Sequence, residues 1–339
     1  MNWRSFVKRS VYYPVRNSLP FRRPERPEGV CMWPWRGLVI YCDLDTTCNC
    51  GTSLKQLLTG NVGSGVRRVW QGKLYQEIRR GWLAGRIPYF CRGCPVPFMK
   101  TLNGYPYLLR ERPELPDYPP LLQIEPTAAC NLRCPQKACD QKLIRNHRRK
   151  MFMSLDEFRD LIDEAGAHTE TINFFNFGEP FLHKDAISMV AYAKKVNPRT
   201  FILSDTNGHF FRSPEKQEAI VESGIDRLVF SVDGAVQSSY EKYRVGGNIE
   251  VALAAMRGIV DIRNRRGLMK PEVIWKYILF STNDSDEEIT KAEEMAREIG
   301  VPLRWHITTF PKGWPSVRFQ KVANLPVRMR ENLFCAELA

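Results

Sequence analysis

Residues 121–143 read LLQIEPTAACNLRCPQKACDQKL and join an apolar strand to a cysteine-bearing loop. Cys130, Cys134 and Cys139 fall within ten residues of one another. Thiols so close in sequence cannot easily pair with one another, but they can converge on one metal centre. Three thiolates can hold three irons of a [4Fe–4S] cluster and leave the fourth iron open to a small ligand. The stretch therefore predicts a metal centre after a strand, with a structural zinc loop as the alternative.

Strands and helices alternate from this stretch towards the end of the chain. Helical segments with capping residues at Ser154 and Ser285 lie among segments that have the length and composition of strands. The expected strands are 121–127, 171–177, 200–205, 227–232, 272–280 and 303–309. This β-then-α order predicts an α/β fold with a parallel sheet, which the pattern alone allows to be a doubly wound sheet or a barrel.

Composition indicates a globular protein, and we expect it in the cytoplasm. The chain has 339 residues, of which 43% are hydrophobic and 26% charged. No apolar run approaches the roughly 18 residues of a membrane span, and basic residues interrupt the N-terminus where a signal peptide would be apolar. Ten cysteines in a cytoplasmic chain favour metal binding over disulfides. The net charge of +13 suits an acidic partner or a solvated basic surface, and the basic run Arg145 to Lys150 is expected to face solvent.

Changes in composition along the chain suggest a division into regions. Prolines and basic residues dominate the first region and cysteines the second. Prolines return in the third region, which is expected to be an extended connector. The regions are a basic arm at 1–30, a cysteine-rich unit at 31–98, a linker at 99–120, a main domain at 121–310 and a C-terminal strap at 311–339.

The motif Cys-Asn-Leu-Arg-Cys-Pro at 130–135 resembles the cluster loop of radical S-adenosylmethionine (radical SAM) enzymes. That family usually spaces its cysteines C-x3-C-x2-C, whereas this chain has C-x3-C-x4-C with Asp140 after the third cysteine. The resemblance implies that Cys130, Cys134 and Cys139 hold a [4Fe–4S] cluster to which SAM binds. It also selects a partial (β/α)6 TIM-like barrel with its site at the C-terminal ends of the strands.

The resemblance continues at the ends of the second and third strands. The sequence NFGEP at 176–180 is similar to the family's GGE element, with phenylalanine in place of the first glycine. This similarity implies that Gly178 and Glu179 contact the SAM amino group. In the same way, Ser204 and Asn207 resemble the Ser/Thr-Asn-Gly element near the ribose. The NFGEP element could instead be a plain turn with a proline at the end of a strand.

The fourth and fifth strands complete the implied SAM site. Ser231 and Arg244 look like the serine and arginine that bind the SAM carboxylate in this family. An arginine suits that role because its fork of donors fits two carboxylate oxygens. The alternative for Arg244 is a charge on a helix surface. The backbone of residues 277–279 would lie near the adenine.

A second resemblance covers the cysteine-rich unit. The unit ends in a C-x2-C pair, which together with distant cysteines is a strong sign of a metal site. Its order of Cys-x-x-Pro-Trp, strand, turn and closing C-x2-C is similar to the SPASM and twitch modules that carry auxiliary clusters in radical SAM proteins. The resemblance implies one auxiliary [4Fe–4S] cluster, and thus two clusters in all, with a zinc ribbon as the alternative. Its ligands would be Cys31, Cys91, Cys94 and either Cys48 or Cys50.

Together these resemblances imply an oxidoreductase that reductively cleaves SAM to a 5′-deoxyadenosyl radical, which removes hydrogen from a substrate. An external low-potential electron donor is expected, whereas membrane and nucleic-acid partners are not. Because an auxiliary cluster can accept an electron, we expect a net oxidation of a peptide side chain or a sugar-like metabolite. Epimerisation and rearrangement stay open, and no catalytic residue is assigned because a fold does not define a substrate. The rival hypothesis is a non-enzymatic iron–sulfur or zinc protein that transfers electrons or binds nucleic acid.

Overall fold

The computed structural model describes residues 29–48, 58–92, 94, 108–109, 113–135, 140–308 and 313–334. Cys50 and Cys139, together with most of the expected arm and linker, lie outside the described residues. Within the described residues, strands form a nine-stranded sheet in the order β11-β10-β9-β8-β7-β6-β2-β3-β4 and a two-stranded sheet of β1 and β5.

The large sheet contains the parallel strands that the sequence predicts, side by side in chain order. They are β6 (Leu121–Ile124), β7 (Thr171–Asn173), β8 (Phe201–Thr206), β9 (Arg227–Ser231), β10 (Glu272–Leu279) and β11 (Leu303–Ile307). The predicted α/β class with a parallel sheet is thus confirmed. β7 ends earlier than expected, because Asn176 and Phe177 donate hydrogen bonds to the Glu125 carboxylate instead of extending the strand.

The cysteine-rich unit also contributes to the large sheet. β2 pairs in parallel with β6, so that Ile40 lies opposite Ile124. The ranges 31–98 and 121–310, expected as separate units, therefore share one sheet. A short apolar run shows that a strand forms, but it does not show which sheet the strand joins. The strands of this region are β1 (Val30–Cys31), β2 (Gly37–Ile40), β3 (Asp45–Thr47), β4 (Gly60–Asn61) and β5 (Leu108–Leu109).

Helices connect most of the parallel strands. Ser154 begins α6 with the predicted capping box to Glu157, and at the start of α11 the Ser285 hydroxyl accepts a hydrogen bond from the Glu288 N–H. The α-helices are α2 (Trp33–Arg36), α3 (Val66–Trp70), α4 (Lys73–Leu83), α5 (Gln141–Asn146), α6 (Leu155–Ala165), α7 (Ala186–Val196), α8 (Pro214–Glu222), α9 (Gln237–Tyr243), α10 (Ile249–Arg265), α11 (Asp286–Ile299) and α12 (Val327–Arg330). The short 3-10 helices are η1 (Val62–Ser64), η2 (Tyr89–Cys91), η5 (Gly166–His168), η6 (Pro180–Leu182) and η7 (Val322–Asn324).

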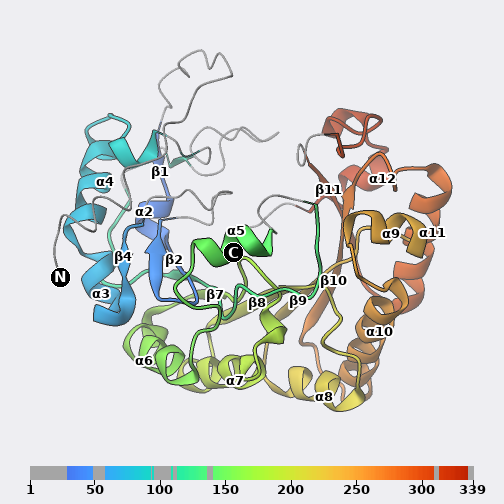
Figure 1. The fold of residues 1–339 in the computed structure, drawn as a ribbon, viewed down its shortest axis with the longest axis horizontal. Helices are drawn as coiled ribbons and strands as arrows, with labels where there is room; N and C mark the ends of the chain where they lie inside the picture. The colour runs from blue at the N-terminus through green and yellow to red at the C-terminus, as the bar shows by residue number, and fades with distance from the viewer. Residues whose placement is uncertain are drawn as a thin grey trace.

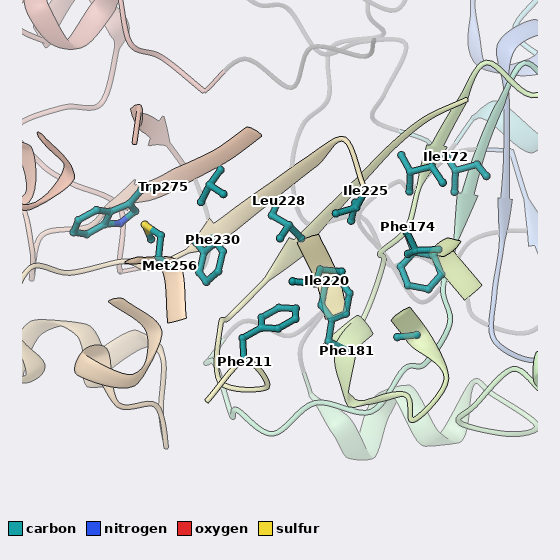
Figure 2. Packing of buried hydrophobic residues seen from close by; sticks show 14 of the residues in the cluster. Ile172, Phe174, Phe181, Phe211, Ile220, Ile225, Leu228, Phe230, Met256 and Trp275 are labelled. Atoms are coloured by element: carbon teal, nitrogen blue, oxygen red, sulfur yellow. The ribbon is translucent and has the colours of Figure 1, made fainter. Parts of the chain in front are cut away.

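The sheet curves into an open arc whose outer side is covered by α6, α7, α8, α10 and α11 (Figure 1). Ile172, Leu228 and Trp275 from three strands pack there against Ile220 of α8 and Met256 of α10 in one buried cluster (Figure 2). Burial of this apolar layer is the main favourable contribution to folding. An open arc with helices outside is the form expected of a partial barrel.

The concave face of the sheet carries polar side chains among its apolar ones. The register places Gln123 opposite Asn173 and Ser231 opposite Lys276. Successive side chains of a strand point to opposite faces, so these residues lie on the side away from the buried cluster. The concave face is therefore able to bind polar ligands, as the ends of barrel strands commonly do.

A buried ion pair joins the ends of β2, β6 and β7. Arg148 Nε lies 2.8 Å from Glu125 Oε1, and the two side chains are only 4% and 0% exposed. The same carboxylate accepts hydrogen bonds from the backbone N–H groups of Cys42 and Phe177. The expectation that the run Arg145 to Lys150 faces solvent is therefore wrong at Arg148. A run of like charges does not show which of its members meets a buried carboxylate.

Glu125→Gln should lower the stability of the protein by about 3–5 kcal/mol, because it leaves the buried Arg148 charge without its partner. Urea unfolding followed by circular dichroism measures the loss. Glu170→Gln is the matched control, because Glu170 pairs with Arg36 at the surface, where the side chains are 68% and 46% exposed. The control should change stability by only about 0–1 kcal/mol. Equally small effects of both substitutions would contradict the importance of the buried pair.

Candidate cluster loop and cofactor site

The cysteine loop follows β6 and places two of its three thiols in a small apolar cluster. Cys130 and the buried Cys134 pack there with Leu132 and Tyr243. Burial raises the pKa of the Cys130 thiol to about 11, although the Leu132 N–H, 3.4 Å from the sulfur, acts in the opposite direction. Cys139 lies outside the described residues. The neutral form of the Cys130 thiol is therefore favoured, and metal binding must displace its proton.

The turn after β7 packs directly against the cysteine loop. The Glu179 N–H donates to the Ala129 carbonyl at 2.8 Å. Gly178 has a φ of +93°, and a Cβ atom at this position would lie 2.6 Å from the Ala129 oxygen and 2.8 Å from the Thr127 oxygen. Glycine satisfies both the backbone conformation and the lack of space. The predicted NFGEP element is therefore in contact with the loop that precedes it by some fifty residues in the sequence.

Glu179 is buried between the ends of β7 and β8. Its Oε1 accepts a hydrogen bond from Thr206 Oγ1 at 2.8 Å, and its Oε2 accepts one from the Asn207 N–H at 2.7 Å. Burial raises the pKa of Glu179 to about 7, while these hydrogen bonds act in the opposite direction. A cation beside this carboxyl group would favour its ionised form. The site is therefore suited to a positively charged ligand group.

Only one of the two predicted residues near the end of β8 reaches the cysteine loop. Asn207 Nδ2 donates to Asn131 Oδ1 at 2.8 Å. Ser204 is fully buried, and its hydroxyl donates to the Phe174 carbonyl at 2.7 Å. Asp205, the next residue, lies on the concave face instead, because a shift of one residue along a strand changes the face.

Arg244 follows α9 and is mostly buried, so it is not the helix-surface charge considered above. Its Nε lies 2.6 Å from Asp233 Oδ2, and its Nη1 lies 3.8 Å from Cys134 Sγ. The other oxygen of Asp233 accepts a hydrogen bond from the Ile278 N–H at 2.7 Å. Ser231, the other residue expected at the SAM carboxylate, lies on the concave face at the end of β9. Arg244 thus links the end of β9 and the backbone of β10 to the cysteine loop.

An ion pair on the concave face was not predicted from the sequence. Lys276 of β10 binds Asp205 of β8 across the intervening β9, and its Nζ lies 5.1 Å from the centre of the Phe334 ring. Burial lowers the pKa of the nearby His306, and the Lys276 charge lowers it further. The signal that could have found the pair is Lys276 itself, a charged residue in the middle of a mostly apolar strand.

Four thiols of the N-terminal region belong to a second apolar cluster. These are the buried Cys31 and Cys91 and the partly buried Cys48 and Cys94. Burial raises the pKa of Cys48, and Cys31, Cys91 and Cys94 raise it further, so the thiols lie within electrostatic reach of one another. Among the described residues, no three His, Cys, Asp or Glu side chains are arranged to hold a single metal ion.

The chain belongs to the radical SAM superfamily, whose family model matches residues 124–325, more than half of the chain. The match includes the cysteine loop and the ends of the parallel strands β6 to β11. The four thiols of the N-terminal region lie outside the matched residues.

Similar curated proteins carry different names. An AdoMet-dependent heme synthase of Methanosarcina barkeri is 28% identical over 192 residues, which are 56% of this chain and 50% of that protein. A GTP 3′,8-cyclase of Limosilactobacillus fermentum is 31% identical over 135 residues, 39% of each chain. Among solved structures, methylornithine synthase shares 17% identity and a TM-score of 0.42, with 57% of this chain and 55% of that chain covered. The chain spans half or less of the length of these curated relatives.

Membership of the superfamily makes the protein a radical SAM enzyme, which uses a [4Fe–4S] cluster and SAM and needs an electron donor. The predicted enzyme class and cofactors are thereby confirmed, and the non-enzymatic rival is rejected. The auxiliary cluster stays a prediction. In the described part of the chain, no helix is both long and apolar enough to span a membrane.

Gly178→Ala should weaken SAM binding by about tenfold or more, because the strain and the clash with the cysteine loop together exceed the ~1.4 kcal/mol that corresponds to a tenfold change. Isothermal titration of the anaerobically reconstituted protein measures the affinity. Gly267→Ala is the control, because Gly267 also has a positive φ, +63°, but a Cβ atom there meets nothing within 4 Å. If the Gly178 variant binds SAM as tightly as the control, the contact between the turn and the loop does not matter for the cofactor.

Proposed function

We propose that Cys130, Cys134 and Cys139 hold the SAM-binding [4Fe–4S] cluster, with SAM on the concave side of the sheet. The main support is that the ends of successive strands all contact the cysteine loop. The contacts are Glu179 with Ala129 from β7, Asn207 with Asn131 from β8, and Arg244 with Cys134 from beyond β9. A ligand that contacts the open iron would therefore lie among these side chains.

The proposed roles follow from the local contacts. Glu179 receives the SAM ammonium group, because a buried carboxyl group is stabilised as an anion by a neighbouring cation. Gly178 lets the turn that carries Glu179 lie against the cysteine loop, and Asn207 offers its amide to the ribose. Ser231 lies on the concave face, where its hydroxyl could also bind the SAM carboxylate. Ser204 has the weakest support, because its hydroxyl is already bonded on the helix-facing side.

Arg244 is proposed to bind the SAM carboxylate. Asp233 holds one side of its guanidinium, while Nη1 is directed at Cys134. A SAM carboxylate bound to the Arg244 guanidinium would lie next to Cys134, one of the proposed cluster ligands. SAM must lie there to reach the open iron of the cluster. The backbone of residues 277–279 passes the same place, which supports the expected position of the adenine.

The substrate is proposed to bind on the concave face beside Lys276 and Asp205. Bound together, the cluster and SAM supply a 5′-deoxyadenosyl radical, which removes a hydrogen atom from the substrate. The ion pair offers donors and acceptors for charge-assisted hydrogen bonds, and Phe334 shields it from water. A peptide side chain and a sugar-like metabolite both present groups that such a pair can bind. The names of the similar proteins refer to different substrates, so they do not distinguish a peptide from a sugar-like metabolite.

We propose in addition that the N-terminal thiols hold an auxiliary [4Fe–4S] cluster. Cys48 is favoured over Cys50 as the fourth ligand, because it lies with the other three thiols. Cys42 is directed elsewhere and donates to the Lys150 carbonyl at 3.1 Å. Phe177, which precedes the Gly178 turn, packs against the same apolar cluster. This contact connects the auxiliary site to the SAM site. The proposed ligands are Cys31, Cys48, Cys91 and Cys94.

An auxiliary cluster in this position supports a net two-electron oxidation. SAM consumes one electron from an external donor, and the substrate then loses one hydrogen atom. The carbon left with an unpaired electron can next lose a proton to a base and one electron to the auxiliary cluster. The product would lack two hydrogens, as in alcohol dehydrogenation or in cross-linking of a peptide side chain.

Replacing the three loop cysteines by alanine should abolish SAM cleavage yet leave about four irons per chain, half of the about eight in the wild-type protein, because the auxiliary cluster survives. Iron and sulfide analysis after anaerobic reconstitution measures this. Cys42→Ala is the control and should keep both clusters. Absence of iron from the triple variant would remove the auxiliary cluster from the proposal.

With its true substrate, the enzyme should consume one SAM per product and give a product two hydrogens lighter. Anaerobic turnover followed by mass spectrometry measures both quantities. A product of unchanged mass would contradict oxidation and indicate epimerisation or rearrangement.

A further inference from the structure

Arg79 of α4 is a buried cation beside the four N-terminal thiols. The residue is 4% exposed, and its guanidinium lies 4.3 Å from the centre of the Trp70 ring and 5.0 Å from that of Tyr75. Nε donates to the Pro34 carbonyl at 2.7 Å, and Nη1 donates to the Trp70 carbonyl at 2.8 Å. These contacts fix the guanidinium rigidly inside the N-terminal region.

The charge of Arg79 has no carboxylate partner among the described residues, because its bonded acceptors there are neutral carbonyls. Nη2 is buried and has no hydrogen-bond partner in the described part of the chain. A buried charge is strongly unfavourable unless an opposite charge accompanies it. Burial accordingly lowers the pKa of Arg79 to about 10, whereas Tyr75 and Cys48 act in the opposite direction. Cys48, one of the four thiols, is thus within electrostatic reach of the guanidinium.

A cluster bound to four thiolates would provide the missing negative charge. The thiolates outweigh the charge of the iron–sulfide core, so the whole centre is an anion. One-electron reduction adds a further negative charge, which a nearby cation in a low-dielectric region stabilises. We propose that Arg79 is the counter-ion of the auxiliary cluster and raises its reduction potential, which suits a cluster that accepts an electron from the substrate. This inference depends on the auxiliary cluster proposed above.

Arg79→Met in the protein that lacks the three loop cysteines should lower the potential of the auxiliary cluster. We expect a fall of at least about tenfold in the equilibrium constant for reduction, which is ~59 mV for one electron. A redox titration followed by electron paramagnetic resonance measures it, and the missing loop cluster removes the overlapping signal. Arg80→Met is the matched control, because Arg80 is the next residue of α4 and is exposed. Arg79→Lys keeps the charge and should recover most of the potential.

A second measurement separates electrostatics from packing. Cluster loading should raise the urea concentration at the unfolding midpoint. If Arg79 is the counter-ion, Arg79→Met makes this rise smaller, whereas the iron-free protein loses little stability. Equal losses in the iron-free and loaded proteins would overturn the role, because they indicate packing alone.

Different results would overturn the counter-ion role of Arg79 and the auxiliary cluster itself. An unchanged potential in Arg79→Met would overturn the counter-ion role and leave the cluster standing. Zinc in place of iron in the protein without loop cysteines would overturn the auxiliary cluster itself.

Discussion

The Glu125–Arg148 pair holds together the end of the sheet at which the candidate site lies. Arg148 stacks 3.6 Å from the centre of the Tyr41 ring beyond β2, while Glu125 ends β6. Asn176 and Phe177 beyond β7 bind the same carboxylate. The pair thereby fixes the start of the cysteine loop relative to the Gly178 turn. Because it is buried, its loss would leave an uncompensated charge at this junction.

The two faces of the sheet differ in the side chains that they carry. The helix-facing side is apolar and stabilises the arc, whereas the concave side carries the charged pair of Asp205 and Lys276. Loops at the strand ends then bring Glu179 and Arg244 to the cysteine loop. The N-terminal region extends the same sheet through β2, so its four thiols belong to the same continuous sheet structure as the proposed SAM site. Phe177 packs against both the apolar cluster of the four thiols and the main core of the sheet.

Local sequence patterns were sufficient for the parallel strands, the capping box at Ser154 and the position of the Gly178 turn, whereas the barrel-like strand order was implied only by the family resemblance. They were insufficient wherever a residue's role depends on a distant partner. Arg148 belongs to a basic run that resembles a solvated surface, and only the folded chain shows Glu125 opposite it. Ser204 and Asp205 differ by one position, so assigning their faces needs the register of β8. The expected roles of Cys50 and Cys139 lie outside the described residues and stay predictions.

The most direct test of the account is reductive cleavage of SAM by the purified chain. Anaerobic protein reconstituted with iron and sulfide would be incubated with dithionite and SAM, and 5′-deoxyadenosine and methionine would be measured by mass spectrometry. The account predicts that both form in the wild-type protein and that neither forms in Cys134→Ala. A fully iron-loaded wild-type protein that leaves SAM intact would contradict the central claim that the strand ends and the cysteine loop form a SAM-cleaving site.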